Sequence, residues 1–251
     1  MTFNTTLNFF YNDLPIIKLK IGDKNQKYTD DDYLNNSERV DLLNIKDKID
    51  LEDIRDWDKA KKNSNEFELI HLPSRKLKHE SIAAYEPLSR SYFKMWEILH
   101  NYGFFAPDQQ KEPIHIVNIA EGPGGFIEAL VNYRYKYFRM IDNINAITLK
   151  SMTKEIPGWD KAQTFLRENS NIKINYGADN TGNIYNIENI KHFRDNLPQK
   201  ADFITADGGF DFSSDFNDQE RQSLRIIFCE IVLALACQNL GGTFICKFFD
   251  L

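Results

Sequence analysis

The stretch NIAEGPGGFIEAL, residues 118–130, brings Gly122, Pro123, Gly124 and Gly125 together where an apolar run gives way to a helical pattern. Glycine inside regular structure costs about 0.5–1 kcal/mol relative to alanine, so a cluster of glycines needs a compensating reason. Either the backbone turns very tightly here, or another group approaches it too closely for a side chain to fit. Both readings place a strand before the cluster and a helix after it.

Short apolar runs alternate with helical patterns on both sides of this stretch. The run IHIVNIA at 114–120 is rich in β-branched residues, which is typical of a buried parallel strand. Further strands are expected at 144–149, 171–177, 201–207 and 243–249, and helices at 89–103 (between an N-cap at Ser89 and a stop at Gly103), 126–138 and 219–240 (ended by Gly241 and Gly242). This alternation predicts an α/β fold with a parallel sheet and places a ligand at the carboxyl ends of its central strands.

The first eighty residues differ from the rest of the chain. Residues 15–24, PIIKLKIGDK, alternate like an edge strand, and charged, helix-leaning segments broken by Asp and Asn follow them. We therefore expect an amino-terminal extension or cap over 1–80 and the α/β domain over 81–251. Because the chain stops directly after a predicted strand, with no helix to cover it, we expect this domain to be truncated at its carboxyl end.

Composition narrows the classes of function. The 251 residues are 42% hydrophobic, enough for a real core, and the net charge of −6 excludes a general electrostatic binder of nucleic acid. The three cysteines and five histidines show no C-x-x-C or H-x-x-x-H spacing, so we expect free thiols and no metal. The most apolar stretch, 226–237, is too short for a membrane span and contains Glu230, which predicts a buried helix. With no signal peptide visible, the chain is expected to be soluble, intracellular and cytoplasmic.

Three ligands compete for the glycine cluster. A dinucleotide fold requires G-x-G-x-x-G and an acid about 20 residues further on, and a Walker loop requires G-K-[ST]; neither pattern is present. S-adenosylmethionine is the remaining common ligand, since its methionine end can lie over a bare turn near a helix N-terminus. A tight turn without any ligand stays open as the alternative.

Four segments in the same order resemble the motifs of one enzyme family. NIAEGPGGF at 118–126, SRSYFKMWEI at 89–98, ADGGFDFSSDFNDQE at 206–220 and GGTFICKFFDL at 241–251 are similar to segments of the FtsJ-like (RrmJ-type) RNA 2′-O-methyltransferases. The residues of these motifs are most similar to those of the cap-specific mRNA branch of that family, and the resemblance covers residues 87–251. It implies a Rossmann-like S-adenosylmethionine-dependent methyltransferase sheet and methylation of a ribose 2′-hydroxyl, with capped mRNA or another RNA as partner.

The resemblance also implies a catalytic group. Lys94, Asp207 and Lys247 match the first three members of the family's Lys-Asp-Lys-Glu tetrad. We expect Lys247 to activate the 2′-hydroxyl, Lys94 to depress the pKa of Lys247 and hold the ribose or phosphate, and Asp207 to orient both lysines near the methyl donor. Taken singly, Lys94 could instead pair with Glu97 on the helix surface and Asp207 could close a turn. A lysine in the apolar strand around position 247 would be costly without a purpose.

The same resemblance supplies the binding residues. Ser89 stands where the family has an asparagine, and Asp179, in YGADNTGNI, could reach the adenine or the ribose or belong to a polar loop. The residues expected to bind S-adenosylmethionine are Ser89, Gly122, Pro123, Gly124, Gly125, Phe126 and Asp179. The residues expected to bind RNA are Asn217, Asp218, Gln219 and Arg75, although a charged run such as that around Arg75 is more often a solvated surface.

The match has one gap, which keeps a second reading open. The chain ends before the glutamate that completes the tetrad. The alternative is therefore a catalytically impaired module that binds the cap or RNA and retains the donor pocket. A nicotinamide-dependent oxidoreductase is disfavoured, because the second predicted strand ends without the acid that a dinucleotide fold requires. The Asn- and Lys-rich wording also resembles such proteins of large DNA viruses, which would place the chain in a viral factory or virion.

Overall fold

The computed structural model of the chain describes five stretches of residues: 36–64, 83, 85–150, 158–209 and 219–248. The chain divides into two units, residues 1–50 and residues 51–251. The charged segments near the amino terminus form helices α1 (Asn36–Lys46) and α2 (Ile54–Ser64), on either side of the 3-10 turn η2 (Ile49–Leu51). The edge strand expected at 15–24 and the boundary expected after residue 80 lie outside the described residues, so both stay predictions.

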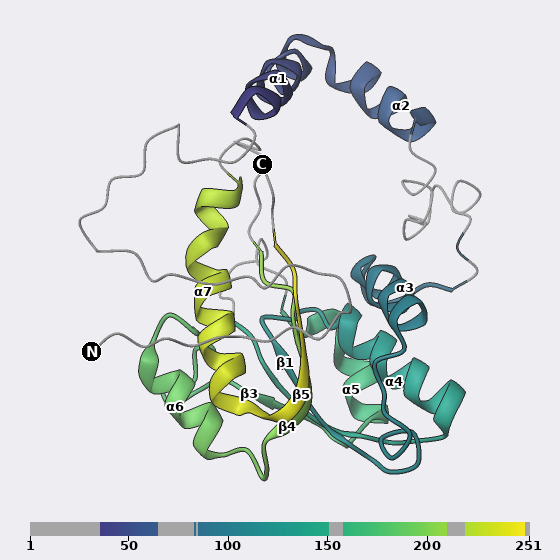
Figure 1. Cartoon of the computed structure of the whole chain (residues 1–251), viewed down its shortest axis with the longest axis vertical. Coiled ribbons are helices and arrows are strands. Elements are labelled where there is room, and N and C mark those ends of the chain that lie inside the picture. Colours follow the sequence, from purple (N-terminus) through teal and green to yellow (C-terminus); the bar gives the residue numbers. More distant parts are fainter. Residues whose placement is uncertain (1–35, 65–82, 84, 151–157, 210–218, 249–251) are drawn as a thin grey trace. The chain divides into compact units, whose positions relative to one another are not determined.

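A parallel sheet in the order β3-β2-β1-β4-β5 forms the centre of the second unit (Figure 1). Its strands are β1 (His115–Ile119), β2 (Asn143–Ile147), β3 (Ile172–Asn175), β4 (Ala201–Ala206) and β5 (Gln238–Cys246). The first four lie where an apolar run predicted a strand, whereas β5 overlaps the run predicted at 243–249 but begins five residues earlier and ends before Lys247. The order reverses between β1 and β4, as in Rossmann-like folds, which confirms the predicted fold class.

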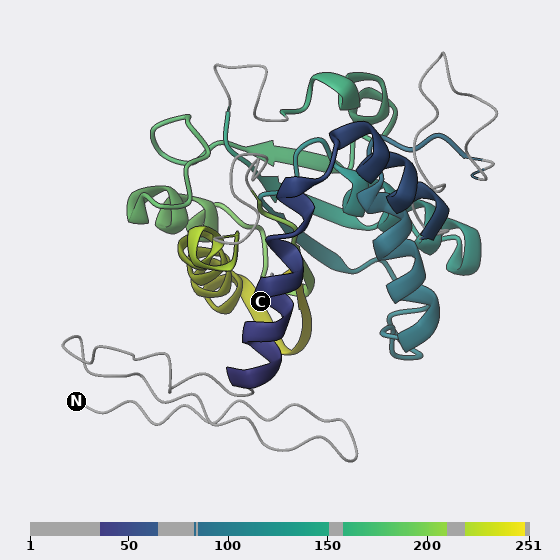
Figure 2. The ribbon, with the colours of Figure 1, turned by 90° about the horizontal axis from the view of Figure 1, so that it is seen from above.

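Helices cover both faces of the sheet (Figures 1 and 2). The helices are α3 (Ser91–Tyr102), α4 (Gly125–Phe138), α5 (Gln163–Glu168, after the 3-10 turn η4, Asp160–Ala162), α6 (Ile187–Asp195) and α7 (Gln219–Cys237). Alternate strand residues serve the two faces: Ile116 packs in the core with α3 and α4, and Val117 in the core with α6 and α7. Burial on both faces explains why the strands read as continuous apolar runs.

Two predicted helix ends differ from the structure. Arg90, and not Ser89, is the N-cap of α3, while Gly103 ends that helix in the left-handed conformation as predicted. The helix expected to run to residue 240 ends at Cys237, and the two glycines lie inside β5. Gly241 has φ +76°, and the pairing of β5 with β4 shifts register beside it, so the glycines allow an irregularity in the strand.

The apolar stretch of α7 packs against the sheet, as expected for a buried helix. Leu233 and Ala234 are fully buried in the core on that face, and so is Glu230. Within the described residues, no helix is long and apolar enough to cross a membrane.

A buried ion pair fixes α4 to the start of β2. The Arg134 guanidinium donates to both carboxylate oxygens of Asp142 at 2.7 Å, and both side chains are almost completely buried. Arg134 also donates to the backbone oxygens of Gln109 and Glu112, and Asp142 accepts from the backbone N–H of Ile114. Each guanidinium nitrogen of Arg134 and both carboxylate oxygens of Asp142 therefore have a hydrogen-bond partner, which is the condition for a buried ion pair to be tolerated.

Replacing Arg134 by alanine should destabilise the fold strongly, because Asp142 would keep a buried charge without its partner. We expect a loss of about 3–5 kcal/mol in the free energy of unfolding, measured by urea denaturation. Lys191→Ala is the control: it breaks the exposed pair with Glu188, and should change stability by less than about 1 kcal/mol. Equal effects of the two substitutions would contradict the assignment.

Candidate functional site

The glycine cluster forms a tight connection between β1 and α4. Gly124 has φ +103°, a backbone conformation that L side chains rarely adopt, and the Gly122–Pro123 peptide bond is cis. A β-carbon on Gly124 would lie 3.0 Å from the ring of Trp159, which is buried against the turn. Tight turning, the first reading of the cluster, is thus confirmed at Gly124.

Close approach, the second reading, holds at Gly125. A β-carbon there would lie 2.2 Å from the hydroxyl oxygens of both Ser89 and Ser91 and 3.0 Å from the backbone nitrogen of Tyr92. The two hydroxyls hydrogen-bond to each other at 2.6 Å. Gly125 therefore lets the start of α3 pack against the start of α4, and Ser89 belongs to this contact.

Asp207 and Lys247 meet at the carboxyl ends of β4 and β5. The Lys247 ammonium lies 2.8 Å from carboxylate Oδ1 of Asp207 and donates to the backbone oxygen of Asp207 at 3.0 Å. The backbone N–H of Lys247 bonds to the oxygen of Ala206, which continues the sheet past the last strand residues. The side chains of Lys247 and Asp207 are 25% and 15% exposed, so solvent still reaches part of the pair.

Glu230 of α7 lies directly behind this pair. Its Oε1 accepts the backbone N–H of Gly208 at 2.9 Å, and its Oε2 accepts from the Cys246 thiol at 3.7 Å. Burial raises the pKa of Glu230 to about 7, against the opposing effects of the Gly208 hydrogen bond and the charge of Lys247. An acid inside an apolar helix is the signal that could have identified this residue from the sequence.

Glu121 supplies a third carboxyl from the turn after β1. Its Oε1 accepts from the Thr205 hydroxyl at 2.5 Å, and Thr205 accepts from the amide of Asn118 at 2.6 Å. Burial, followed by the charge of Asp207, raises the pKa of Glu121 well above its usual value. Glu121 stands inside the glycine motif of the sequence, where no local pattern indicates its role.

The structure does not bring every predicted site residue to this edge. Lys94 is exposed on α3, and its ammonium makes no hydrogen bond or ion pair with the side chain of a described residue, including Asp207 and Glu97. The ring of Phe126 is buried in the apolar core. Arg75, Asn217 and Asp218 lie outside the described residues, as does the side chain of Gln219. The roles of all these residues stay predictions.

Asp179 organises the loop that follows β3. Its two carboxylate oxygens accept hydrogen bonds from Thr181, Asn186 and Asn189. These bonds, that of Thr181 foremost, hold the pKa of Asp179 well below its usual range. The loop abuts the end of β2, because a β-carbon on Gly182 would overlap the backbone oxygen of Thr148. Asp179 thus shapes a loop beside the end of β2, and its predicted contact with a donor stays a prediction.

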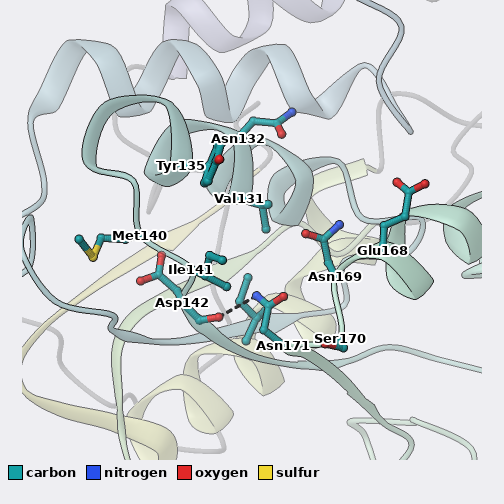
Figure 3. Close-up of a pocket in the computed structure, with 11 residues that line it drawn as sticks. Val131, Asn132, Tyr135, Met140, Ile141, Asp142, Glu168, Asn169, Ser170 and Asn171 are labelled. Carbon is teal, nitrogen blue, oxygen red and sulfur yellow. Dashed lines mark hydrogen bonds between the residues drawn. The ribbon is translucent and has the colours of Figure 1, made fainter.

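A cavity of about 410 Å³ lies at the opposite edge of the sheet (Figure 3). Its lining includes Asn132 and Tyr135 of α4, Glu168 of α5, and Asp142 and Asn171 at the starts of β2 and β3. None of the predicted site residues lines it. Ligands of open parallel sheets bind at the carboxyl ends of the strands, so the Asp207–Lys247 edge remains the candidate site.

Comparison with known proteins relates the chain to one family. Residues 87–251 match the family described as FtsJ-like methyltransferase. The Homo sapiens cap-specific mRNA (nucleoside-2′-O-)-methyltransferase 1 is 34% identical over 156 residues, which cover 57% of this chain and 17% of that protein. The Xenopus laevis protein of the same name is 29% identical over 234 residues, covering 84% and 25%. The Drosophila melanogaster cap-specific mRNA (nucleoside-2′-O-)-methyltransferase 2 is 24% identical over 225 residues, covering 85% and 30%. The chain therefore spans less than a third of each of these relatives.

Gly125→Ala should destabilise the protein, because the new methyl group would overlap Ser89 and Ser91. We expect a loss of about 1–3 kcal/mol in the free energy of unfolding, as for other overpacked sites. Adding Ser89→Ala and Ser91→Ala should recover part of this loss. Gly158→Ala is the matched control, since a β-carbon there meets nothing within 4 Å. Additive effects of the three substitutions would show that the contact is not what excludes a side chain.

The stability of the fold should depend on pH through Glu230. A carboxyl with a raised pKa binds its proton more tightly in the folded state, so its contribution is most favourable below its unfolded pKa. That contribution declines as pH rises from 4.5 to about 7, by about 3 kcal/mol in total. Glu230→Gln cannot titrate, so the wild type should lose stability relative to it over this window in parallel urea titrations. A difference that does not change with pH would contradict the shift.

Proposed function

The chain belongs to the FtsJ-like methyltransferase family, and we propose that it methylates a ribose 2′-hydroxyl of RNA with S-adenosylmethionine as the methyl donor. The observation that carries the proposal is the ion pair of Asp207 and Lys247 at the carboxyl ends of adjacent strands. Two relatives named as cap-specific mRNA methyltransferases support cap-proximal nucleotides of mRNA as the acceptor. The free thiols of the three cysteines support an intracellular location as part of the same proposal.

The residues at this edge fit a positively charged donor. S-adenosylmethionine supplies a methyl group on a sulfonium, which leaves as neutral sulfur. Asp207, Glu121 and Glu230 bring three carboxyl groups to the ammonium of Lys247. A cation nearby favours the ionised form of carboxyls whose pKa burial has raised, so these groups and a sulfonium would stabilise one another. Gly122 and Pro123 are only half-buried, which leaves part of the turn accessible.

The protein's task in this reaction is alignment and proton removal. Lys247 can hydrogen-bond to the acceptor hydroxyl and take its proton as the new carbon–oxygen bond forms, provided that the amine has first released its own proton. Asp207 holds the amine in place through the 2.8 Å contact. Lys94, exposed on α3, would contact the ribose or a phosphate of the RNA and not the ion pair. Orientation of this kind accounts for much of the acceleration in two-substrate reactions.

Methyl transfer to capped RNA tests this proposal. Lys247→Ala should lower turnover about 100-fold or more, since a positioned proton acceptor contributes about 10²–10⁴-fold, while calorimetry should show donor binding close to that of the wild type. Lys191→Ala, on the surface of α6, should leave both quantities unchanged.

Two results would revise the proposal. Turnover that survives Lys247→Ala would remove the assigned mechanism. Donor binding by the wild type without transfer to any capped RNA would favour a binding module that retains the donor pocket. RNA that already carries 2′-O-methyl groups at its cap-proximal nucleotides is the matched substrate control, and it should accept no methyl group.

A further inference from the structure

We propose that Glu230 is a positioning residue, whose carboxyl group ties the ends of β4 and β5 together and so holds Asp207 and Lys247 in register for methyl transfer. The inference rests on the proposed function for its catalytic consequence, but the tie itself is a structural feature. Glu230 lies on α7, far from the nearest predicted catalytic residue in sequence, and its side chain is completely buried.

The contacts of Glu230 flank the ion pair in sequence. Oε1 accepts the N–H of Gly208, the residue after Asp207, and Oε2 accepts from the thiol of Cys246, the residue before Lys247. One carboxyl group therefore touches both strand ends, one position away from each catalytic candidate. The neutral thiol bond is long and weak, so the Gly208 contact carries most of the tie.

The position of Gly208 explains why an acceptor is needed there. The hydrogen bond from Lys247 N–H to the Ala206 oxygen joins the backbones of the two strand ends at 3.0 Å. The N–H of Gly208 comes directly after this point and is buried, and a buried N–H left without an acceptor destabilises the fold. Glu230 supplies its acceptor from the helix behind the sheet.

Gly208 also fits the carboxyl group closely. A β-carbon on Gly208 would lie 2.2 Å from Oε1 of Glu230 and 2.8 Å from Cδ1 of Ile226. The residue after Asp207 can therefore approach α7 only because it has no side chain. The charged or titratable groups that interact with Glu230 come from three strand ends, from α7 itself and from the segment before α6: Asp207, Lys247, Cys246, Glu121, Cys229 and Tyr185.

Core packing alone does not account for a buried carboxyl group at this position. A carboxyl group buried in an apolar helix is costly unless it is hydrogen-bonded, and an aliphatic residue of similar size would fill the same volume without that cost. Retaining an acid is understandable if its oxygens are needed where the strands end. Glutamine keeps the oxygen that accepts from Gly208, whereas methionine has a similar volume and offers only a weak sulfur acceptor. The two substitutions therefore separate the hydrogen bond from the packing.

The test compares Glu230→Gln, Glu230→Met and the wild type in two measurements. In methyl transfer to capped RNA at saturating donor, Glu230→Met should lower kcat roughly 10- to 100-fold, as expected for a misplaced catalytic group, with donor affinity unchanged; Glu230→Gln should recover most of the loss. In competitive acetylation with acetic anhydride, followed by mass spectrometry, Lys247 should react several-fold faster in Glu230→Met than in wild type or Glu230→Gln. Lys191, exposed on α6 and away from this edge, is the internal reference for the amount of reagent, and circular dichroism checks that each variant is folded.

The outcomes separate this inference from the proposed function. If the wild type transfers no methyl group but the acetylation of Lys247 becomes faster only in Glu230→Met, the tie is supported and the proposed function fails. If the wild type is active and folded Glu230→Met matches it in kcat and in Lys247 acetylation, the inference fails. If Glu230→Met does not fold, Gly208→Ala displaces the same carboxyl from the other side. It should give the same two changes, and unchanged values there would overturn the inference.

Discussion

The parallel pairing of β4 with both β1 and β5 is the constraint on which the rest of the site depends. In this register Asn118 lies opposite Thr205, and Ala206 lies opposite Cys246, so the chain leaves all three strands at one edge of the sheet. A slip of one residue would turn every side chain of a strand to the other face. Asp207 and Lys247, 40 positions apart, meet because each directly follows a strand end that this register brings side by side.

The carboxyl groups behind the pair link its electrostatics to the packing of the sheet. Burial that stabilises β1, β4 and α7 also removes water from Glu121 and Glu230 and raises their pKa values. Protonation of these groups limits the negative charge around Lys247, and their ionisation would increase it. A bound cation would shift that balance toward the ionised forms. The charge state of the edge is therefore tied to whether a positively charged donor is present.

The sequence predicts the fold well because the information for it is local. Each buried strand reads as a short β-branched run, and the order of strands and helices admits few topologies. Asp207 and Lys247 are also predictable, since each directly follows such a run. Glu230 and Glu121 are harder to assign, because their roles depend on which strand ends lie beside them. The register shift beside Gly241 and the serine contact at Gly125 depend on packing between distant elements, which no local pattern records.

The protein's own packing explains part of the glycine turn. At Gly124 and Gly125 the space that a side chain would occupy is taken by Trp159, Ser89 and Ser91, so these two glycines are explained by the protein's own packing. The resemblance assigns the same residues to a methyl donor, yet their bare α-carbons face neighbouring side chains. Any donor bound at this turn must therefore contact the backbone of the turn and the half-buried residues Gly122 and Pro123. Packing at the later glycines then fixes the shape of the turn, and binding at the earlier residues would use that shape.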